Sequence, residues 1–82
     1  MITAYEDVKW VELLYGHEAD LNGVTIGAYT FEDANGVPED GYVGWVKSTQ
    51  HNVDEPADLT LDLETAKRSA YDRAVVLLEL LT

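Results

Sequence analysis

The sequence predicts one α+β domain spanning residues 1–82, with a three-stranded antiparallel sheet covered by an N-terminal helix and a long C-terminal helix (α-β-β-β-α). Three observations predict this fold: an Asn-Gly pair between extended segments, two segments rich in β-branched and aromatic residues, and a C-terminal stretch with helical periodicity. The apolar fraction of 46% far exceeds that of a disordered acidic tail. A chain of 82 residues builds one modest core.

Residues 4–15 are predicted to form the first helix. Thr3 and Glu6 have the spacing of a capping box, in which two side chains satisfy free backbone N–H groups at a helix start. Gly16 stands where a left-handed C-cap residue is needed. The apolar residues recur at helical spacing, at Val8, Val11, Leu14 and Tyr15. An early strand is the alternative, but the apolar residues of 8–14 do not alternate cleanly.

The sheet is predicted from the middle of the chain. Asn22-Gly23 is the strongest short hairpin signal, because both residues tolerate positive φ. It separates residues 18–21 from residues 24–31, which together with residues 42–48 have the composition of strands. The polar stretch 32–41 between the two central strands suits an exposed hairpin loop. Gly27 and Gly44, inside those strands, indicate bulges or close packing of another element.

The end of the chain is predicted to be a surface connection over residues 49–58, followed by the long helix. Pro56 argues against regular structure in the connection. Asp62 is placed to cap the helix, although the alternation over residues 59–63 also fits a short preceding strand. The inward stripe of the helix comprises Leu63, Ala66, Ala70, Ala74, Leu77 and Leu81.

Val76 and Leu80 widen the apolar arc of this last helix beyond its main stripe. One interpretation is that the helix is deeply packed or frays at its end. The other is a contact with a second molecule, which makes a homodimer through Val76 and Leu80 an open alternative.

Composition favours the cytoplasm as the location. The chain contains no cysteine, which excludes disulfides and suits a reducing compartment. It begins without a basic segment or an apolar run, so we expect no cleavable signal. No stretch approaches the roughly 18 apolar residues of a membrane span, so we expect no membrane partner.

Catalytic patterns are missing, and we predict a protein that is not an enzyme and has no cofactor. The two histidines, His17 and His51, fit no zinc-binding spacing, so no metal is predicted. Asp20 and Asp33 each open a run resembling the centre of a calcium loop, but tyrosine stands nine residues later, where such a loop needs glutamate. There is no glycine-rich phosphate loop.

The charge distribution carries the functional prediction. Sixteen acidic residues against five Lys and Arg give a net charge of −11, which repels nucleic acid and attracts basic protein surfaces. Nine of the acids precede Lys47, and Lys67, Arg68 and Arg73 lie on the last helix. Binding is therefore expected at the sheet-and-loop end of the molecule. The contact candidates are acidic doublets: Glu32, Asp33, Glu39, Asp40, Asp54 and Glu55.

In size, acidity and lack of cysteine or catalytic motifs, the chain resembles the small phage-encoded anti-CRISPR and anti-restriction proteins, several of which act as DNA mimics. The resemblance implies a protein inhibitor that acts in the host cytoplasm by binding a CRISPR effector subunit. It would block the basic surface that reads the protospacer-adjacent motif or holds the target strand.

A charge-based inhibitor also needs anchors other than charge, because exposed ion pairs contribute only about 0–1 kcal/mol each. Tyr29, Tyr42 and Trp45 are candidates if they face outward, although core packing is expected for most of them.

Two further interpretations of the acidity stay open. The acids can form an ordinary solvated surface or an adaptation to high salt. The protein can also be a small homo-oligomeric scaffold or regulatory interaction module whose acidity serves only solubility.

Overall fold

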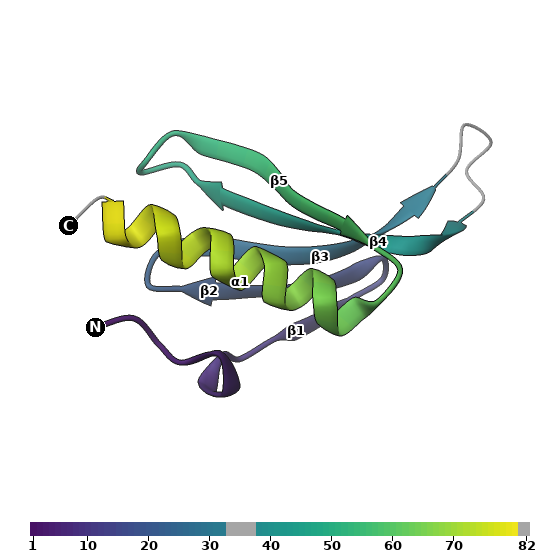
Figure 1. Cartoon of the computed structure of the whole chain (residues 1–82), viewed down its shortest axis with the longest axis horizontal. Helices are drawn as coiled ribbons and strands as arrows, with labels where there is room; N and C mark the ends of the chain where they lie inside the picture. The colour runs from purple at the N-terminus through teal and green to yellow at the C-terminus, as the bar shows by residue number, and fades with distance from the viewer. Residues whose placement is uncertain (33–37, 81–82) are drawn as a thin grey trace.

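A five-stranded antiparallel sheet and one long helix make up the fold (Figure 1). The computed structural model describes residues 1–32 and 38–80. The strands lie side by side in chain order, so that β1 and β5 form the two edges. The elements are the 3-10 turn η1 (Tyr5–Asp7), the strands β1 (Val11–Leu13), β2 (Gly16–Leu21), β3 (Val24–Glu32), β4 (Pro38–Ser48) and β5 (Val53–Thr60), and the helix α1 (Leu63–Leu80).

The predicted helix over residues 4–15 is wrong. Only Tyr5–Asp7 turn, as η1, and Val11–Leu13 form the edge strand β1. The capping box does not form: the Thr3 N–H instead donates to Asn22 Oδ1 (3.1 Å), and Ala4 occupies the cap position without a side-chain bond. Leu14, in the expected apolar stripe, is fully exposed. The pairing of β1 with β2 therefore prevails over the local helical pattern.

The predicted number of strands is also wrong, because residues 49–58 are not simply a surface connection. They contain the turn into β5, whose first residue Val53 pairs with Ser48. Asn52 makes that turn possible with a φ of 56°. Pro56 belongs to β5 and pairs with Trp45. A proline is tolerated there because β5 is an edge strand and needs no N–H bond on its free side.

The Asn22-Gly23 hairpin and the C-terminal helix are confirmed. Asn22 and Gly23 have φ values of 52° and 92°, and Leu21 pairs directly with Val24 across the turn. Helix α1 begins after Asp62, whose carboxylate accepts the Thr65 backbone N–H at 2.9 Å. These bonds to Thr65 hold the pKa of the Asp62 carboxyl below its usual value. Leu81 lies outside the described residues.

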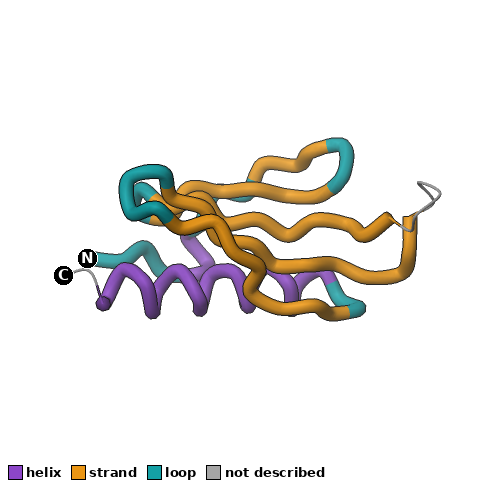
Figure 2. Tube along the Cα trace, turned by 90° about the horizontal axis from the view of Figure 1, so that it is seen from above, coloured by secondary structure: helices purple, strands orange, loops and turns teal. Residues whose placement is uncertain are grey.

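The core lies between α1 and one face of the sheet (Figure 2). Small residues let the helix approach closely: Ala66, Ala70 and Ala74 are fully buried. Gly44 faces them, since a Cβ added there would lie 2.8 Å from the Ala66 carbonyl oxygen. The prediction that Gly44 marks close packing is thus confirmed. The sheet supplies the larger buried side chains Leu21, Val24, Ile26 and Val46.

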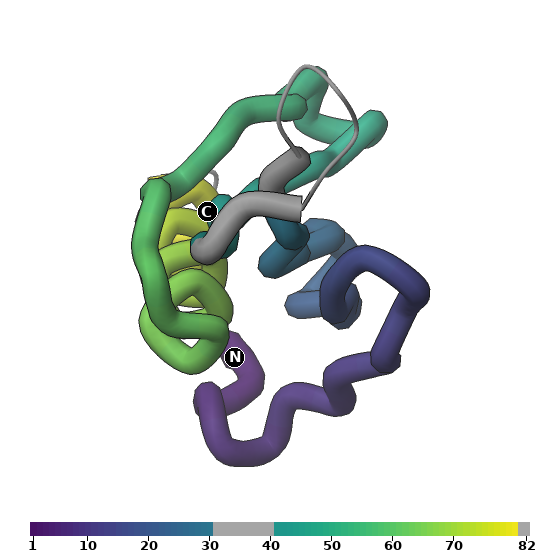
Figure 3. The backbone as a smooth tube through the Cα atoms, turned by 90° about the vertical axis from the view of Figure 1, so that its right-hand side faces the viewer, coloured from purple at the N-terminus to yellow at the C-terminus, as the bar shows by residue number. Residues whose placement is uncertain are grey.

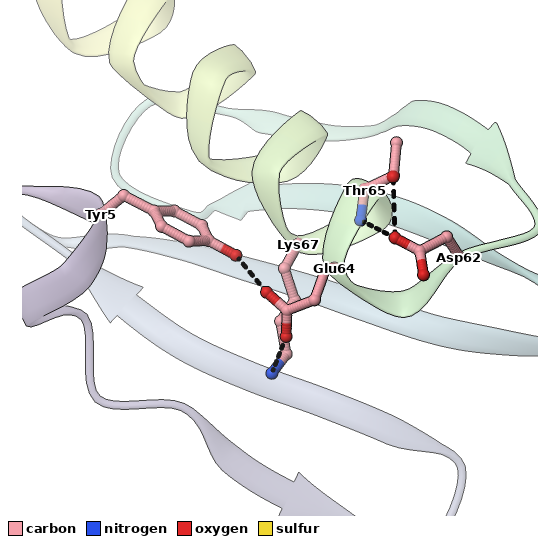
Figure 4. Close-up of polar contacts among 5 residues, drawn as sticks. All are labelled: Tyr5, Asp62, Glu64, Thr65 and Lys67. Carbon is pink, nitrogen blue, oxygen red and sulfur yellow. Dashed lines mark hydrogen bonds and ion pairs between the residues drawn. The ribbon is translucent and has the colours of Figure 1, made fainter.

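The N-terminal segment completes the covering of this face and runs from α1 to β1 (Figure 3). Ile2, Val8 and Trp10 pack against the core. The Tyr5 hydroxyl donates to Glu64 on α1 at 3.1 Å (Figure 4), and the Tyr71 hydroxyl donates to the Thr3 carbonyl at 2.7 Å. Helix α1 and residues 1–10 therefore cover one face of the sheet together.

Candidate functional site

The opposite face of the sheet has no helix over it among the described residues (Figure 2). We call it the open face. Its members follow from the pairing register, because directly paired residues share a face and alternate residues along a strand do too. The open face carries Glu18, Asp20, Thr25, Tyr29, Val43, Trp45, Lys47 and Asp54.

Two aromatic rings on the open face are each held by a carboxylate. The Tyr29 hydroxyl donates to Glu18 Oε2 at 2.5 Å, and Trp45 Nε1 donates to Asp54 Oδ1 at 2.6 Å. Gly27 makes room for the first ring: a Cβ at this position would lie 2.4 Å from Tyr29 Cζ. The expectation of a bulge or of another element packing at Gly27 is therefore wrong, because the close neighbour is a side chain of the same strand.

A third ring and one cation complete the group. The Tyr15 ring lies 6.2 Å from the Tyr29 ring between centroids, and 57% of Tyr15 is exposed. Lys47 Nζ lies 5.8 Å from the centroid of the Tyr29 ring, within reach of a cation–π interaction. Tyr15, Glu18, Tyr29, Trp45, Lys47 and Asp54 line one shallow hollow of about 390 Å³.

Acids outnumber bases on the open face. Among the side chains that the structure describes, the open face carries three carboxylates, on Glu18, Asp20 and Asp54, against the single ammonium of Lys47. The bases of α1 are already paired: Lys67 with Glu64 (3.6 Å), Arg68 with Asp72 (3.4 Å) and Arg73 with Glu55 (2.7 Å). The open face therefore combines an excess of carboxylates with exposed aromatic surface.

Burial and carboxylate partners stabilise the neutral form of two tyrosines. Burial raises the pKa of Tyr29, and its hydrogen bond to the Glu18 carboxylate raises the pKa further. Burial also raises the pKa of Tyr5 to about 12, with the bond to Glu64 as the second cause and Arg68 acting in the opposite direction.

Alkaline pH is therefore expected to weaken the fold through these tyrosines. An unfolded tyrosine titrates near pH 10, so a raised folded-state pKa contributes stability that is present below about pH 10 and is lost as the pH rises towards about 12. Tyr5→Phe and Tyr29→Phe remove this contribution. Urea midpoints measured between about pH 9 and pH 12 should decline less steeply in either variant than in the wild type. Parallel declines in all three proteins would contradict the assigned pKa shifts.

The predicted doublet of Asp54 and Glu55 is divided by the sheet. These neighbours in β5 point to opposite faces, as successive strand residues do. Asp54 lies on the open face beside Trp45. Glu55 lies on the helix side, where it accepts from Arg73 Nε at 2.9 Å. Only Asp54 of the pair belongs to the open face.

Three of the other predicted contact residues, Glu32, Glu39 and Asp40, lie where β3 ends and β4 begins. Glu32 pairs with Pro38 and Glu39 pairs with Phe31, so their backbones are adjacent. Asp40 also belongs to β4. Asp33 lies outside the described residues. The expected exposed loop over residues 32–41 is wrong at both ends, because Glu32 belongs to β3 and residues 38–41 belong to β4. Glu32 pairs with Pro38, whereas Asp40 lies where the register between β3 and β4 shifts.

Sequence reasoning missed Glu18 and Asp20 as site residues and placed most aromatics in the core. Tyr29 and Trp45 lie on the open face instead. One signal was available: Ala19 and Leu21 alternate with Glu18 and Asp20, which is typical of a strand with one buried and one solvated face. Both aromatics occupy odd positions, whereas the buried Ile26, Ala28 and Val46 occupy even ones.

No helix among the described residues is both long and apolar enough to cross a membrane. Within the same residues, no group of three or more His, Cys, Asp or Glu side chains is arranged to hold a metal ion. His17 lies in β2, with its Nδ1 buried and unpartnered.

Comparisons with protein-family models, with curated proteins and with solved structures found no match.

Proposed function

We propose that this chain is a non-enzymatic binding protein whose open face docks on a basic surface of a partner protein, of the kind that holds nucleic acid. The observation that carries the proposal is the open face itself, where three carboxylates and the rings of Tyr15, Tyr29 and Trp45 are not covered by any described helix. Charge complementarity speeds encounter with a basic partner, and aromatic side chains supply the desolvated contacts that charge alone lacks.

Direct binding of nucleic acid is the competing use of an aromatic sheet face, because exposed rings can stack on bases. The net charge of −11 opposes it, since phosphate contacts need an excess of Lys and Arg. Lys47 is the only base on the open face among the described residues. An acidic face instead occupies the place of nucleic acid on a partner. A CRISPR effector subunit, the partner implied by the compositional resemblance, has such a basic surface.

A capture experiment with charge-matched variants tests the proposal. The test variant is Glu18→Lys, Asp20→Lys and Asp54→Lys, and the control is Glu6→Lys, Asp7→Lys and Glu12→Lys, with the same change in net charge away from the open face. The wild type and the control should retain a basic partner from cell extract, and the test variant should lose it. Raising the salt concentration should weaken capture, because it screens the attraction.

The retained partner then decides whether mimicry is the mode of action. Mobility-shift assays should show that the wild-type protein displaces nucleic acid from it and that the test variant does not. Equal capture by both variants, or a partner that holds nucleic acid unaffected, would contradict the proposal. Circular dichroism establishes that the variants are folded.

A second candidate function is a homo-oligomeric scaffold that assembles through α1. Its specific observation is that 50% of Val76 and 76% of Leu80 are exposed on the helix. Light scattering distinguishes the two functions: a dimer that dissociates on Val76→Glu and Leu80→Glu substitution supports the scaffold, and a monomer at high concentration excludes it.

A further inference from the structure

The hollow on the open face has the chemistry of a receptor for one particular kind of side chain. Its walls combine the rings of Tyr15, Tyr29 and Trp45 with two carboxylates, Glu18 and Asp54. The carboxylates are fixed by the ring donors, each of which uses only part of a carboxylate's acceptor capacity. Aromatic faces beside free acceptor sites attract a flat cation that also donates hydrogen bonds.

The molecule already places a cation at this position. Lys47 Nζ lies 5.8 Å from the centroid of the Tyr29 ring, on the open face. Lys47 is exposed and forms no ion pair with any described residue, so a stronger ligand can displace its ammonium. Because Gly27 has no side chain, the Tyr29 ring can lie close to the sheet. The hydrogen bond from the Tyr29 hydroxyl to Glu18 then fixes the ring and the carboxylate relative to each other.

We propose that this hollow receives an arginine side chain of the partner, whose guanidinium stacks on Tyr29 in place of Lys47 and donates hydrogen bonds to Glu18. The Trp45–Asp54 pair forms the adjoining wall. The inference rests on the proposed function and names the residue type that the open face recognises. Arginine suits the hollow better than lysine because its guanidinium is planar, stacks on rings, carries five donors and is less strongly hydrated than an ammonium.

Fluorescence of Trp45 provides a direct measurement. The chain has two tryptophans, and Trp10 lies on the helix side beneath Lys67, so Trp10→Phe leaves Trp45 as the only reporter. Nona-arginine and nona-lysine peptides are titrated into this protein at low and at physiological ionic strength. The arginine peptide should bind about five-fold more tightly and should change the Trp45 emission.

Matched variants separate recognition from bulk charge. Glu18→Gln removes one charge from the hollow, and Glu6→Gln removes one from η1. Glu18→Gln should abolish the preference for arginine, and Glu6→Gln should leave it unchanged. Tyr29→Leu should abolish it as well, whereas Tyr29→Phe, which keeps the ring, should preserve most of it. The two Tyr29 variants together guard against a loss caused by misfolding.

The possible failures are distinguishable. The arginine site is contradicted if both peptides bind with equal affinity and if Glu18→Gln and Glu6→Gln weaken that binding to the same extent. The proposed attraction to basic partners would still hold in that case. A preference for arginine that survives Glu18→Gln and Tyr29→Leu also overturns the site. If neither peptide binds at low ionic strength, the proposed function fails together with it.

Discussion

Replacing Gly44 with alanine is expected to destabilise the protein by about 1–3 kcal/mol, because the new Cβ has no free space. It would lie 2.8 Å from the Ala66 carbonyl oxygen and 3.3 Å from the Ala70 nitrogen. Both are backbone atoms of α1, so the whole helix has to move away from β4. The buried contacts of Ala66, Ala70 and Ala74 with the sheet loosen with it.

Gly27→Ala is the matched control, since it makes the same change on the opposite face of the sheet. The atoms nearest to the new Cβ belong to the far end of the Tyr29 side chain, which can swing away. The expected loss is about 1 kcal/mol for the bond to Glu18, partly offset by the lower entropy of the unfolded chain. Urea denaturation of the two variants measures the difference. An equal loss in both would contradict the close approach of α1 to Gly44.

Truncating Ile26 to alanine is expected to lower the free energy of unfolding by about 2–5 kcal/mol. Ile26 has no exposed surface and lies in β3, the central strand of the sheet. The loss of stability combines the lost apolar burial with the cavity that remains. The cavity remains because α1 already packs on the sheet through small residues and cannot move closer to fill it. A domain of 82 residues is stable by only about 4–12 kcal/mol, so the variant is expected to melt far below the wild type.

Leu59→Ala is the control for this truncation, since 64% of Leu59 is exposed. It should change the thermal midpoint little, because a surface substitution stays within about 0.5 kcal/mol. Scanning calorimetry compares the three proteins. If Leu59→Ala lowered the thermal midpoint as much as Ile26→Ala does, the result would contradict the position of the apolar core in the structure.

The interior hairpin and the last helix could be predicted because their signals are local. Asn22-Gly23 prefers the backbone angles that the turn uses, and the alanine stripe of α1 repeats at helical spacing with Asp62 as its cap. The edge strands could not be predicted in this way. Residues 11–13 form a strand only because β2 supplies partners, and Pro56 is tolerated only because β5 lies at an edge.

For the candidate site, the sequence predicted only the acidic character and not the residues that come together. Acidity and scarcity of bases point to a basic partner, but the choice of doublets assumed that neighbours in the chain act together. In a strand they do not: Asp54 lies on the open face and Glu55 on the helix side. Glu18, Tyr29 and Asp54, separated by many residues, meet because β2, β3, β4 and β5 lie side by side.

By itself, then, the sequence determined the charge, the absence of cysteine, the tight turn and the capped helix, since each depends on composition or on residues close together in the chain. The number of strands, the covering of one sheet face and the open face opposite were set by the tertiary structure. Those features depend on pairing between segments far apart in the chain. Pairing register decides which side of the sheet every second residue occupies.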